Sequence, residues 1–175
     1  TIEAAISLIT ASPRPYGDIT ILSHGAENRA VALETAGRTH ALRKMEEDAI
    51  WSSNSFRSPA LEVHDARGAL SGDPHLDRQR FPRYFSYQEL ISQNYGCIDT
   101  RKAVDILRDP YPREREGFMY KGGTAICRST TCFSLLFKPS RLHCWVSCQG
   151  LPAPQGRYRC FDQRSGTLLG EDGLP

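Results

Sequence analysis

Two short segments hold the side chains whose chemistry stands out in this sequence. Residues 124–137 read TAICRSTTCFSLLF and carry a single charged side chain, Arg128, among small and apolar neighbours. Arginine is rarely buried without a partner, and its planar fork of N–H donors suits a carboxylate or a carbonyl oxygen. The pattern predicts a strand that presents Arg128 to such a partner. The alternative is an exposed arginine on an edge strand.

Residues 49–56 read AIWSSNSF and are predicted to form another strand. Trp51 and Phe56 enclose a polar centre in which Asn54 stands between serines.

Together with one further segment, these sequences resemble the acyl-coenzyme A:6-aminopenicillanate (isopenicillin N) acyltransferase family and its amidohydrolase relatives. The family shows a strand ending near TNHF, which stands here as Ser53-Asn54-Ser55-Phe56. It also shows a helix ending in an LRD-type sequence, here Leu107-Arg108-Asp109, and an ICR strand running into FS, here Ile126-Cys127-Arg128 and Phe133-Ser134. The order and spacing agree along roughly residues 1–165. Ser55 departs from the pattern, because the family has a histidine there.

The resemblance implies an N-terminal-nucleophile hydrolase fold that acts on linear, non-peptide C–N bonds of a small amide or acyl substrate, without a cofactor. It implies that the amide of Asn54 stabilises a tetrahedral oxyanion, a task that suits a neutral and fixed donor. It also implies that Arg128 holds the nucleophile's thiolate or orients a carboxylate. If both roles hold, Asn54 and Arg128 are expected to face one cleft from neighbouring strands. The structural alternatives are an asparagine that satisfies a strand-end turn and an arginine in a surface ion pair.

The nucleophile that the resemblance implies is a cysteine at a chain N-terminus, whose own α-amine serves as the base. This cysteine is expected upstream of residue 1, in an N-terminal segment or a second chain that completes the domain. Thr1 is the alternative nucleophile, but an amphipathic helical pattern follows it and favours a helix cap. Cys127 and Cys132 lie inside the predicted strand, not at a free terminus.

The cysteines are predicted to be small core residues in a reducing compartment, which favours a cytoplasmic location. Their density is below the ~8–10% of a disulfide scaffold. None of their spacings is the C-x2-C pair that binds zinc readily, so no metal site is expected. A site that joins His143 to Cys144 and Cys148 is the metal alternative. The six are Cys97, Cys127, Cys132, Cys144, Cys148 and Cys160.

Composition and charge limit the number of domains and the kinds of partner that are expected. A chain of 175 residues suits one domain, and 39% hydrophobic residues are enough to bury a core. No apolar run approaches the ~18 residues of a transmembrane helix, so no membrane partner is expected. The net charge is +2 and no block of Lys and Arg stands out, so nucleic acid is not expected as a partner either.

Hydrophobic periodicity and turn residues give the remaining elements. Residues 57–82 are expected to be a long loop that could cover a substrate pocket. The tail after Ser165 is expected to fray. Helices are predicted at 1–10, 87–95 and 100–109, and further strands at 18–23, 27–35, 37–45, 142–148 and 158–162.

The predicted fold is α+β, part of a four-layer αββα sandwich of stacked antiparallel sheets, in which residues 1–175 form the C-terminal portion of a single domain. The predicted function is a portion of a cysteine-dependent amidohydrolase or N-acyltransferase that works through an acyl-enzyme. A non-catalytic relative that keeps the sandwich as a binding or interaction module is the alternative. Ser55 in place of the family's histidine keeps this alternative open.

Overall fold

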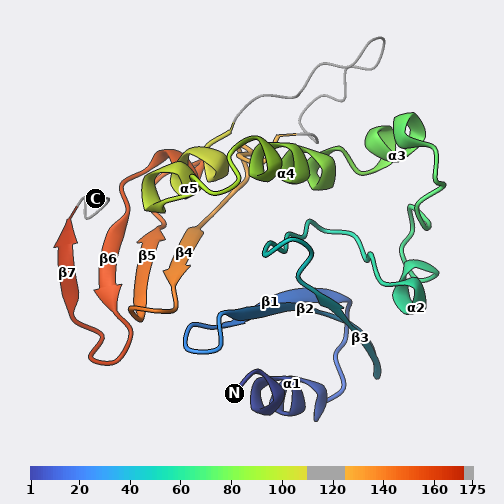
Figure 1. The fold of residues 1–175 in the computed structure, drawn as a ribbon, viewed down its shortest axis with the longest axis horizontal. Helices are drawn as coiled ribbons and strands as arrows, with labels where there is room; N and C mark the ends of the chain where they lie inside the picture. Colours follow the sequence, from blue (N-terminus) through green and yellow to red (C-terminus); the bar gives the residue numbers. More distant parts are fainter. Residues whose placement is uncertain (110–124, 172–175) are drawn as a thin grey trace. The chain divides into compact units, whose positions relative to one another are not determined.

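The computed structural model describes residues 1–109 and 125–171, which divide into two compact units at Tyr84 (Figure 1). The first unit contains a three-stranded sheet and the second a four-stranded sheet, and both sheets are antiparallel. This mixed α+β architecture with two antiparallel sheets agrees with the coarse fold prediction. No helix among the described residues is long and apolar enough to cross a membrane.

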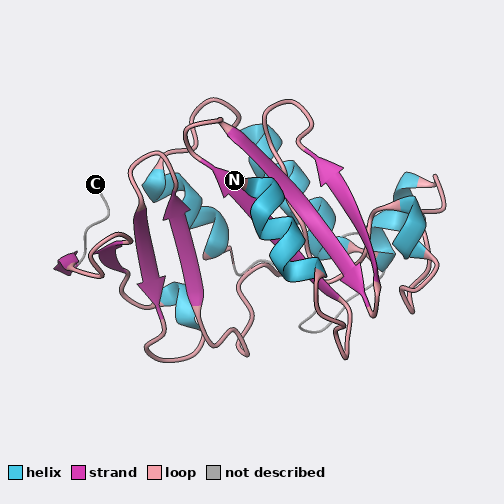
Figure 2. Cartoon of the chain, turned by 90° about the horizontal axis from the view of Figure 1, so that it is seen from below, coloured by secondary structure: helices cyan, strands magenta, loops and turns pink. Residues whose placement is uncertain are grey.

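The first unit begins with α1 (Ile2–Thr10), followed by β1 (Asp18–His24), β2 (Arg29–Ala36) and β3 (Thr39–Lys44), paired in that order. The hydroxyl of Thr1 accepts a hydrogen bond from the backbone N–H of Ala4 at 3.2 Å, so Thr1 is the predicted helix cap. Helix α1 lies across one face of the sheet (Figure 2).

The central strand β2 is buried on both faces, since successive residues from Val31 to Thr35 point to opposite sides and all are buried. Gly37 has φ +57° in the turn that follows, a left-handed conformation that few other residues tolerate. These three strands and their turns lie close to the predicted positions. The buried position of Glu34 among apolar neighbours requires a partner for its charge.

The prediction of a strand at 49–56 is wrong. Glu46 and Ala49 form an isolated bridge, and residues 50–58 contain no regular structure. The backbone N–H groups at the end of this segment donate to carboxylates instead of to a neighbouring strand: Phe56 to Asp65, and Arg57 and Ser58 to Glu34. These carboxylates accept the backbone hydrogen bonds that a neighbouring strand would otherwise accept.

The prediction of an irregular loop over residues 57–82 is also wrong in part. The segment contains α2 (Pro59–Glu62) and α3 (Pro74–Arg80), and α4 (Pro82–Gln93) begins at its end. Each of these helices starts with proline, which is tolerated in the first turn because its missing N–H has no helical partner there. Asp73 caps α3 by accepting from the backbone of His75 and Leu76.

The second unit holds the larger part of α4, then α5 (Thr100–Leu107), and strands β4 (Ser134–Lys138), β5 (His143–Ser147), β6 (Arg159–Asp162) and β7 (Leu168–Glu171), paired in that order. A short 3-10 helix, η1 (Ala153–Gln155), lies between β5 and β6. Asp99 caps α5, accepting from the N–H of Lys102 at 2.8 Å. The core of this unit forms where Val104 of α5 packs with Trp145, Tyr158 and Cys160.

Two predictions for this unit need correction. The strand predicted at 124–138 is confined to β4, and residues 125–133 are irregular; Thr124 lies outside the described residues. A turn at Arg128 interrupts the pattern, because Thr131 accepts from the N–H of Arg128 through its hydroxyl and donates its own N–H to the Arg128 carbonyl. The tail does not fray over residues 168–171, since β7 pairs with β6.

Candidate functional site

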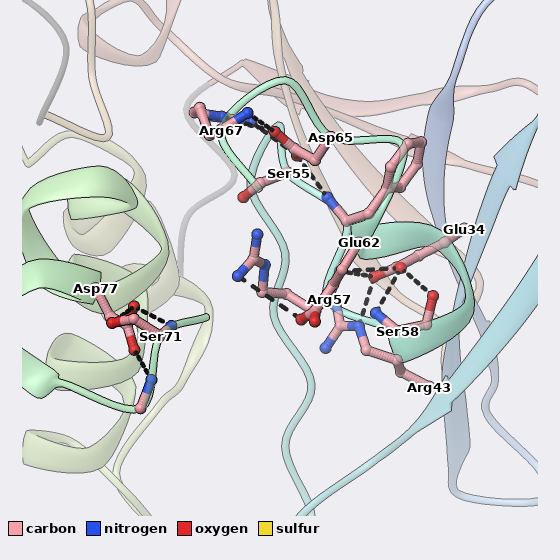
Figure 3. A network of polar contacts seen from close by, with 12 residues as sticks. Glu34, Arg43, Ser55, Arg57, Ser58, Glu62, Asp65, Arg67, Ser71 and Asp77 are labelled. Atoms are coloured by element: carbon pink, nitrogen blue, oxygen red, sulfur yellow. Dashed lines mark hydrogen bonds and ion pairs between the residues drawn. The ribbon is translucent and has the colours of Figure 1, made fainter. Parts of the chain in front are cut away.

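The structure builds a polar network around the carboxylate of Glu34, which lies on β2 and is fully buried (Figure 3). Its oxygens accept from the backbone N–H of Arg57 at 3.0 Å, from the N–H of Ser58 at 2.9 Å and from the Ser58 hydroxyl at 2.6 Å. Glu34 therefore anchors the irregular segment that contains Asn54 to the central strand of the sheet.

Arg43 on β3 supplies the countercharge, with Nε 2.7 Å from Oε1 of Glu34. The same guanidinium donates to the carbonyl of Trp51 and to the hydroxyl of Ser52, both at 3.1 Å. Burial acts to raise the pKa of Glu34, but hydrogen bonds from Ser58 and Arg43 outweigh it and hold the pKa below its usual value. The carboxylate is consequently charged and paired in the folded protein.

A second carboxylate, Asp65, fixes the other side of the segment (Figure 3). It accepts from the N–H of Phe56 at 3.1 Å and from the Nε and NH2 groups of Arg67 at 3.1 and 3.2 Å. Burial acts to raise the pKa of Asp65, but the hydrogen bonds from Arg67 prevail and lower it. This pairing holds the Arg67 guanidinium in one orientation.

The Arg67 guanidinium also donates two hydrogen bonds to Asn54. Its NH1 group donates to Oδ1 of Asn54 at 3.3 Å, and its NH2 group donates to the Asn54 backbone carbonyl. Within the described part of the chain, the Nδ2 amide of Asn54 has no hydrogen-bond acceptor, and the residue is exposed. The oxygen end of the amide is therefore held by the protein, while its two N–H donors are available to a ligand.

Asn54 and Arg67 line a hollow of about 470 Å³ together with Asp18, Phe56, His64 and Asp65. A Cβ atom at Gly17, on the same hollow, would lie 2.6 Å from the ring of Phe56, so only glycine fits there without a shift of that ring. Residues 64–67 come from the predicted long loop. Part of this segment therefore lines the hollow, while the suggestion that the segment covers a substrate pocket stays a prediction.

Sequence and structure comparisons give no relative. No known family model matches this chain, and neither the curated proteins nor the solved structures yield a match. The family resemblance accordingly rests on the motifs alone.

Arg128 belongs to the second unit, whereas Asn54 belongs to the first. The prediction that they stand on neighbouring strands is wrong, because neither residue lies on a strand. Arg128 is half-buried in its turn, and its Nε atom is buried with no hydrogen-bond partner in the described part of the chain.

The remaining candidates are placed as follows. Cys127 is buried and Cys132 is exposed, and both are free thiols outside any strand. Ser55 is buried, with its hydroxyl 3.1 Å from that of Ser53. Across residues 1–109 and 125–171, no three His, Cys, Asp or Glu side chains gather closely enough to hold a metal ion.

Sequence reasoning missed Glu34, Arg43, Asp65 and Arg67, which position the segment around Asn54. Glu34 could have been recognised from the sequence, since it is the only charged residue in the mainly apolar segment AVALETA of residues 30–36. The same reasoning that singled out Arg128 would have selected it. Asp65 and Arg67 gave no comparable signal, because charged residues are ordinary in a segment rich in Arg, Asp and Gly.

Proposed function

We propose that residues 1–175 are part of an amidohydrolase or N-acyltransferase that acts on linear, non-peptide C–N bonds through an acyl-enzyme. In this proposal the chain contributes to an αββα sandwich of the N-terminal-nucleophile type. The observation that carries it is the arrangement of Asn54: Arg67 holds the oxygen end of its amide, and Asn54 lines a hollow of about 470 Å³.

This arrangement suits acyl transfer for an electrostatic reason. Attack on an amide carbonyl turns the carbonyl oxygen into an oxyanion, so a donor fixed in advance stabilises the transition state more than the substrate. A carboxamide held at its oxygen cannot rotate away when the charge develops. The ion pair of Arg67 with Asp65 provides that support at 3.1 Å.

The proposal assigns the nucleophile to a cysteine outside residues 1–175, in an N-terminal segment or a second chain. That cysteine would attack the substrate carbonyl, form a thioester and release the amine; water or an acceptor amine would then take the acyl group. Arg128 would hold the thiolate or orient a substrate carboxylate. These roles follow the residue-by-residue resemblance.

A binding module without catalysis is the second candidate, and the surroundings of Ser55 favour it. Where the family has a histidine, this chain has a buried serine whose hydroxyl lies against Ser53. In this alternative the hollow beside Asn54 would hold a small amide without cleaving it. An acyl adduct on the protein distinguishes the two candidates.

The test uses the natural polypeptide that contains residues 1–175, with 4-nitroanilides of acetate, phenylacetate and octanoate as probes. Intact mass spectrometry should reveal an acyl adduct, and release of 4-nitroaniline should give kcat and KM. Asn54→Ala should lower kcat by about 10²–10³-fold and change KM little, because the lost donor acts mainly in the transition state. A kcat within about threefold of the parent would return Asn54 to a structural role.

Asn54→Asp is the matched control. Aspartate keeps an oxygen that can accept from Arg67, but it replaces the N–H donors with a second oxygen. If Asn54 donates to the oxyanion, both variants lose turnover. If it only shapes the segment through Arg67, Asn54→Asp stays active. Absence of any adduct and of any amine release with all three probes would favour the binding module.

A further inference from the structure

A second hollow, of about 250 Å³, lies wholly within the unit Phe85–Pro175. It opens where α5 begins, at Thr100, and where β4 turns into β5. Its lining combines the basic side chains Lys138, Arg141 and His143 with Trp145 and Leu169. None of these residues belongs to the hollow beside Asn54.

Strand register explains why these side chains gather. Lys138 of β4 and His143 of β5 are cross-strand partners, and Trp145 is two residues further along β5. Side chains two residues apart point to the same face, so all three share the face of the sheet on which Val104 of α5 packs. Trp145 is 4% exposed and forms an aromatic wall, with the ring of His143 edge-on to it at 5.8 Å.

Among the residues that the structure describes, no countercharge pairs with the three basic side chains. Lys138, Arg141 and His143 form no ion pair or side-chain hydrogen bond with any residue that the structure describes. Two acidic side chains of adjoining segments make hydrogen bonds with the backbone, and one of them, Asp162, is the cross-strand partner of His143. Asp99 caps α5 at Lys102, and Asp162 accepts from the backbone of the turn after β6.

We propose that this hollow binds a small organic anion. Its carboxylate or phosphate group would lie between Lys138 and Arg141, whose guanidinium fork matches two oxygens at once. Its apolar part would lie against Trp145 and Leu169. A volume of about 250 Å³ equals about eight waters at ~30 Å³ each, which suits a molecule with one ring. The proposal is independent of the amide chemistry, because its residues are not part of the hollow beside Asn54 and do not include Arg128.

Tryptophan fluorescence provides a direct readout, since the chain has two tryptophans, Trp51 and Trp145. In a Trp51→Phe variant all indole emission comes from the wall of the hollow. Titration with benzoate or phenyl phosphate should change this emission saturably, and the stronger of the two identifies the preferred anionic group. Benzamide, which has the size of benzoate but no charge, should bind at least about tenfold more weakly. Calorimetry on the wild-type chain should give the same ranking without the substitution.

Charge removal tests the residues. Lys138→Gln and Arg141→Gln should each weaken anion binding by about tenfold or more, because each loses a charge-assisted hydrogen bond. Arg157→Gln removes the same charge from an exposed position outside the lining and should change affinity by less than about twofold. Circular dichroism confirms that each variant folds. Equal binding of benzamide, equal loss in Arg157→Gln, or no saturable binding below about 10 mM would overturn the proposal.

Discussion

The hydroxyl of Ser58 donates to the buried carboxylate of Glu34 at 2.6 Å, although 24 residues separate the two in sequence. Ser58 precedes α2 at the position where serine usually caps a helix, yet its side chain makes no capping hydrogen bond. The hydroxyl donates its hydrogen bond to the Glu34 carboxylate instead. The start of α2 is thus tied to the central strand β2, and the segment that carries Asn54 is fixed at its C-terminal end.

The first prediction concerns Glu34→Gln. Glutamine replaces an acceptor oxygen with donors that face the N–H groups of Arg57 and Ser58, and it removes the countercharge of Arg43. We expect unfolding free energy to fall by about 3–5 kcal/mol, measured by urea denaturation. Glu47→Gln, at an exposed turn position, should cost less than about 0.5 kcal/mol. Similar losses in the two variants would show that the Glu34 network does not stabilise the fold.

The second prediction concerns pH. The pKa of Glu34 in the folded protein lies below its ordinary value of 4.5, so the folded state favours the charged form. The resulting stability is fully present above pH 4.5 and is lost as the pH falls through the folded pKa. The stability difference between wild type and Glu34→Gln should therefore shrink as the pH falls from about 6 to about 3. A difference that stays constant over this range would contradict the charge-based explanation.

The third prediction compares two arginines. Arg43 pairs with Glu34 at 2.7 Å. The side chain of Arg57 is 2% exposed, and its three guanidinium nitrogens make no hydrogen bond with any residue that the structure describes. Arg57 lies 3.8 Å over the ring of Phe81, and its nearest carboxylate, Glu62, is 3.9 Å away. Burial lowers the pKa of Arg57, because removing the charged guanidinium from water costs free energy.

We expect Arg43→Met to cost about 3–5 kcal/mol, because it leaves the Glu34 charge buried without its partner. Arg57→Met should change stability by less than about 1 kcal/mol, since methionine fills similar space and carries no charge that needs solvation. Thermal or urea denaturation of the two variants decides the matter. A loss in Arg57→Met as large as that in Arg43→Met would mean that the stacking on Phe81 stabilises the charged form strongly.

Local sequence patterns were enough to predict part of this fold. They failed where contacts with residues distant in sequence determine the local structure. The strands β1 to β3 and helix α5 could be predicted, because alternation, turn residues and the Asp99 cap act within a few positions. Trp51 and Phe56 flank a polar centre, and this pattern indicated a strand at residues 49–56. Glu34 and Asp65 instead accept hydrogen bonds from the backbone N–H groups of this segment, which therefore does not pair with a strand. Arg67 could not be linked to Asn54 from the sequence, since only folding brings these residues together.

The fourth prediction concerns the thiols. All six cysteines lie among the described residues and are free; Cys97, Cys132 and Cys148 are exposed, and Cys127, Cys144 and Cys160 are buried. Burial raises the pKa of Cys144 and of Cys160, which lowers the thiolate fraction that reacts. Ellman's reagent should modify the exposed group rapidly and the buried group only on unfolding. Rapid reaction of all six in the native protein would contradict the burial of the second group.

The last prediction separates Arg67 from Asn54 by a double-mutant cycle in the amide assay. Arg67 touches no reacting atom in the proposed reaction and acts by positioning the Asn54 amide. Arg67→Ala should lower kcat by about tenfold and leave KM nearly unchanged, and it should have little further effect in an Asn54→Ala background. Arg67→Lys should restore part of kcat, since an ammonium can still donate to Oδ1 of Asn54 but cannot also match Asp65 through a planar fork. Independent, additive losses in the double variant would mean that Arg67 acts on the substrate directly or only on the stability of the segment, and a thermal melt of each variant distinguishes these two outcomes.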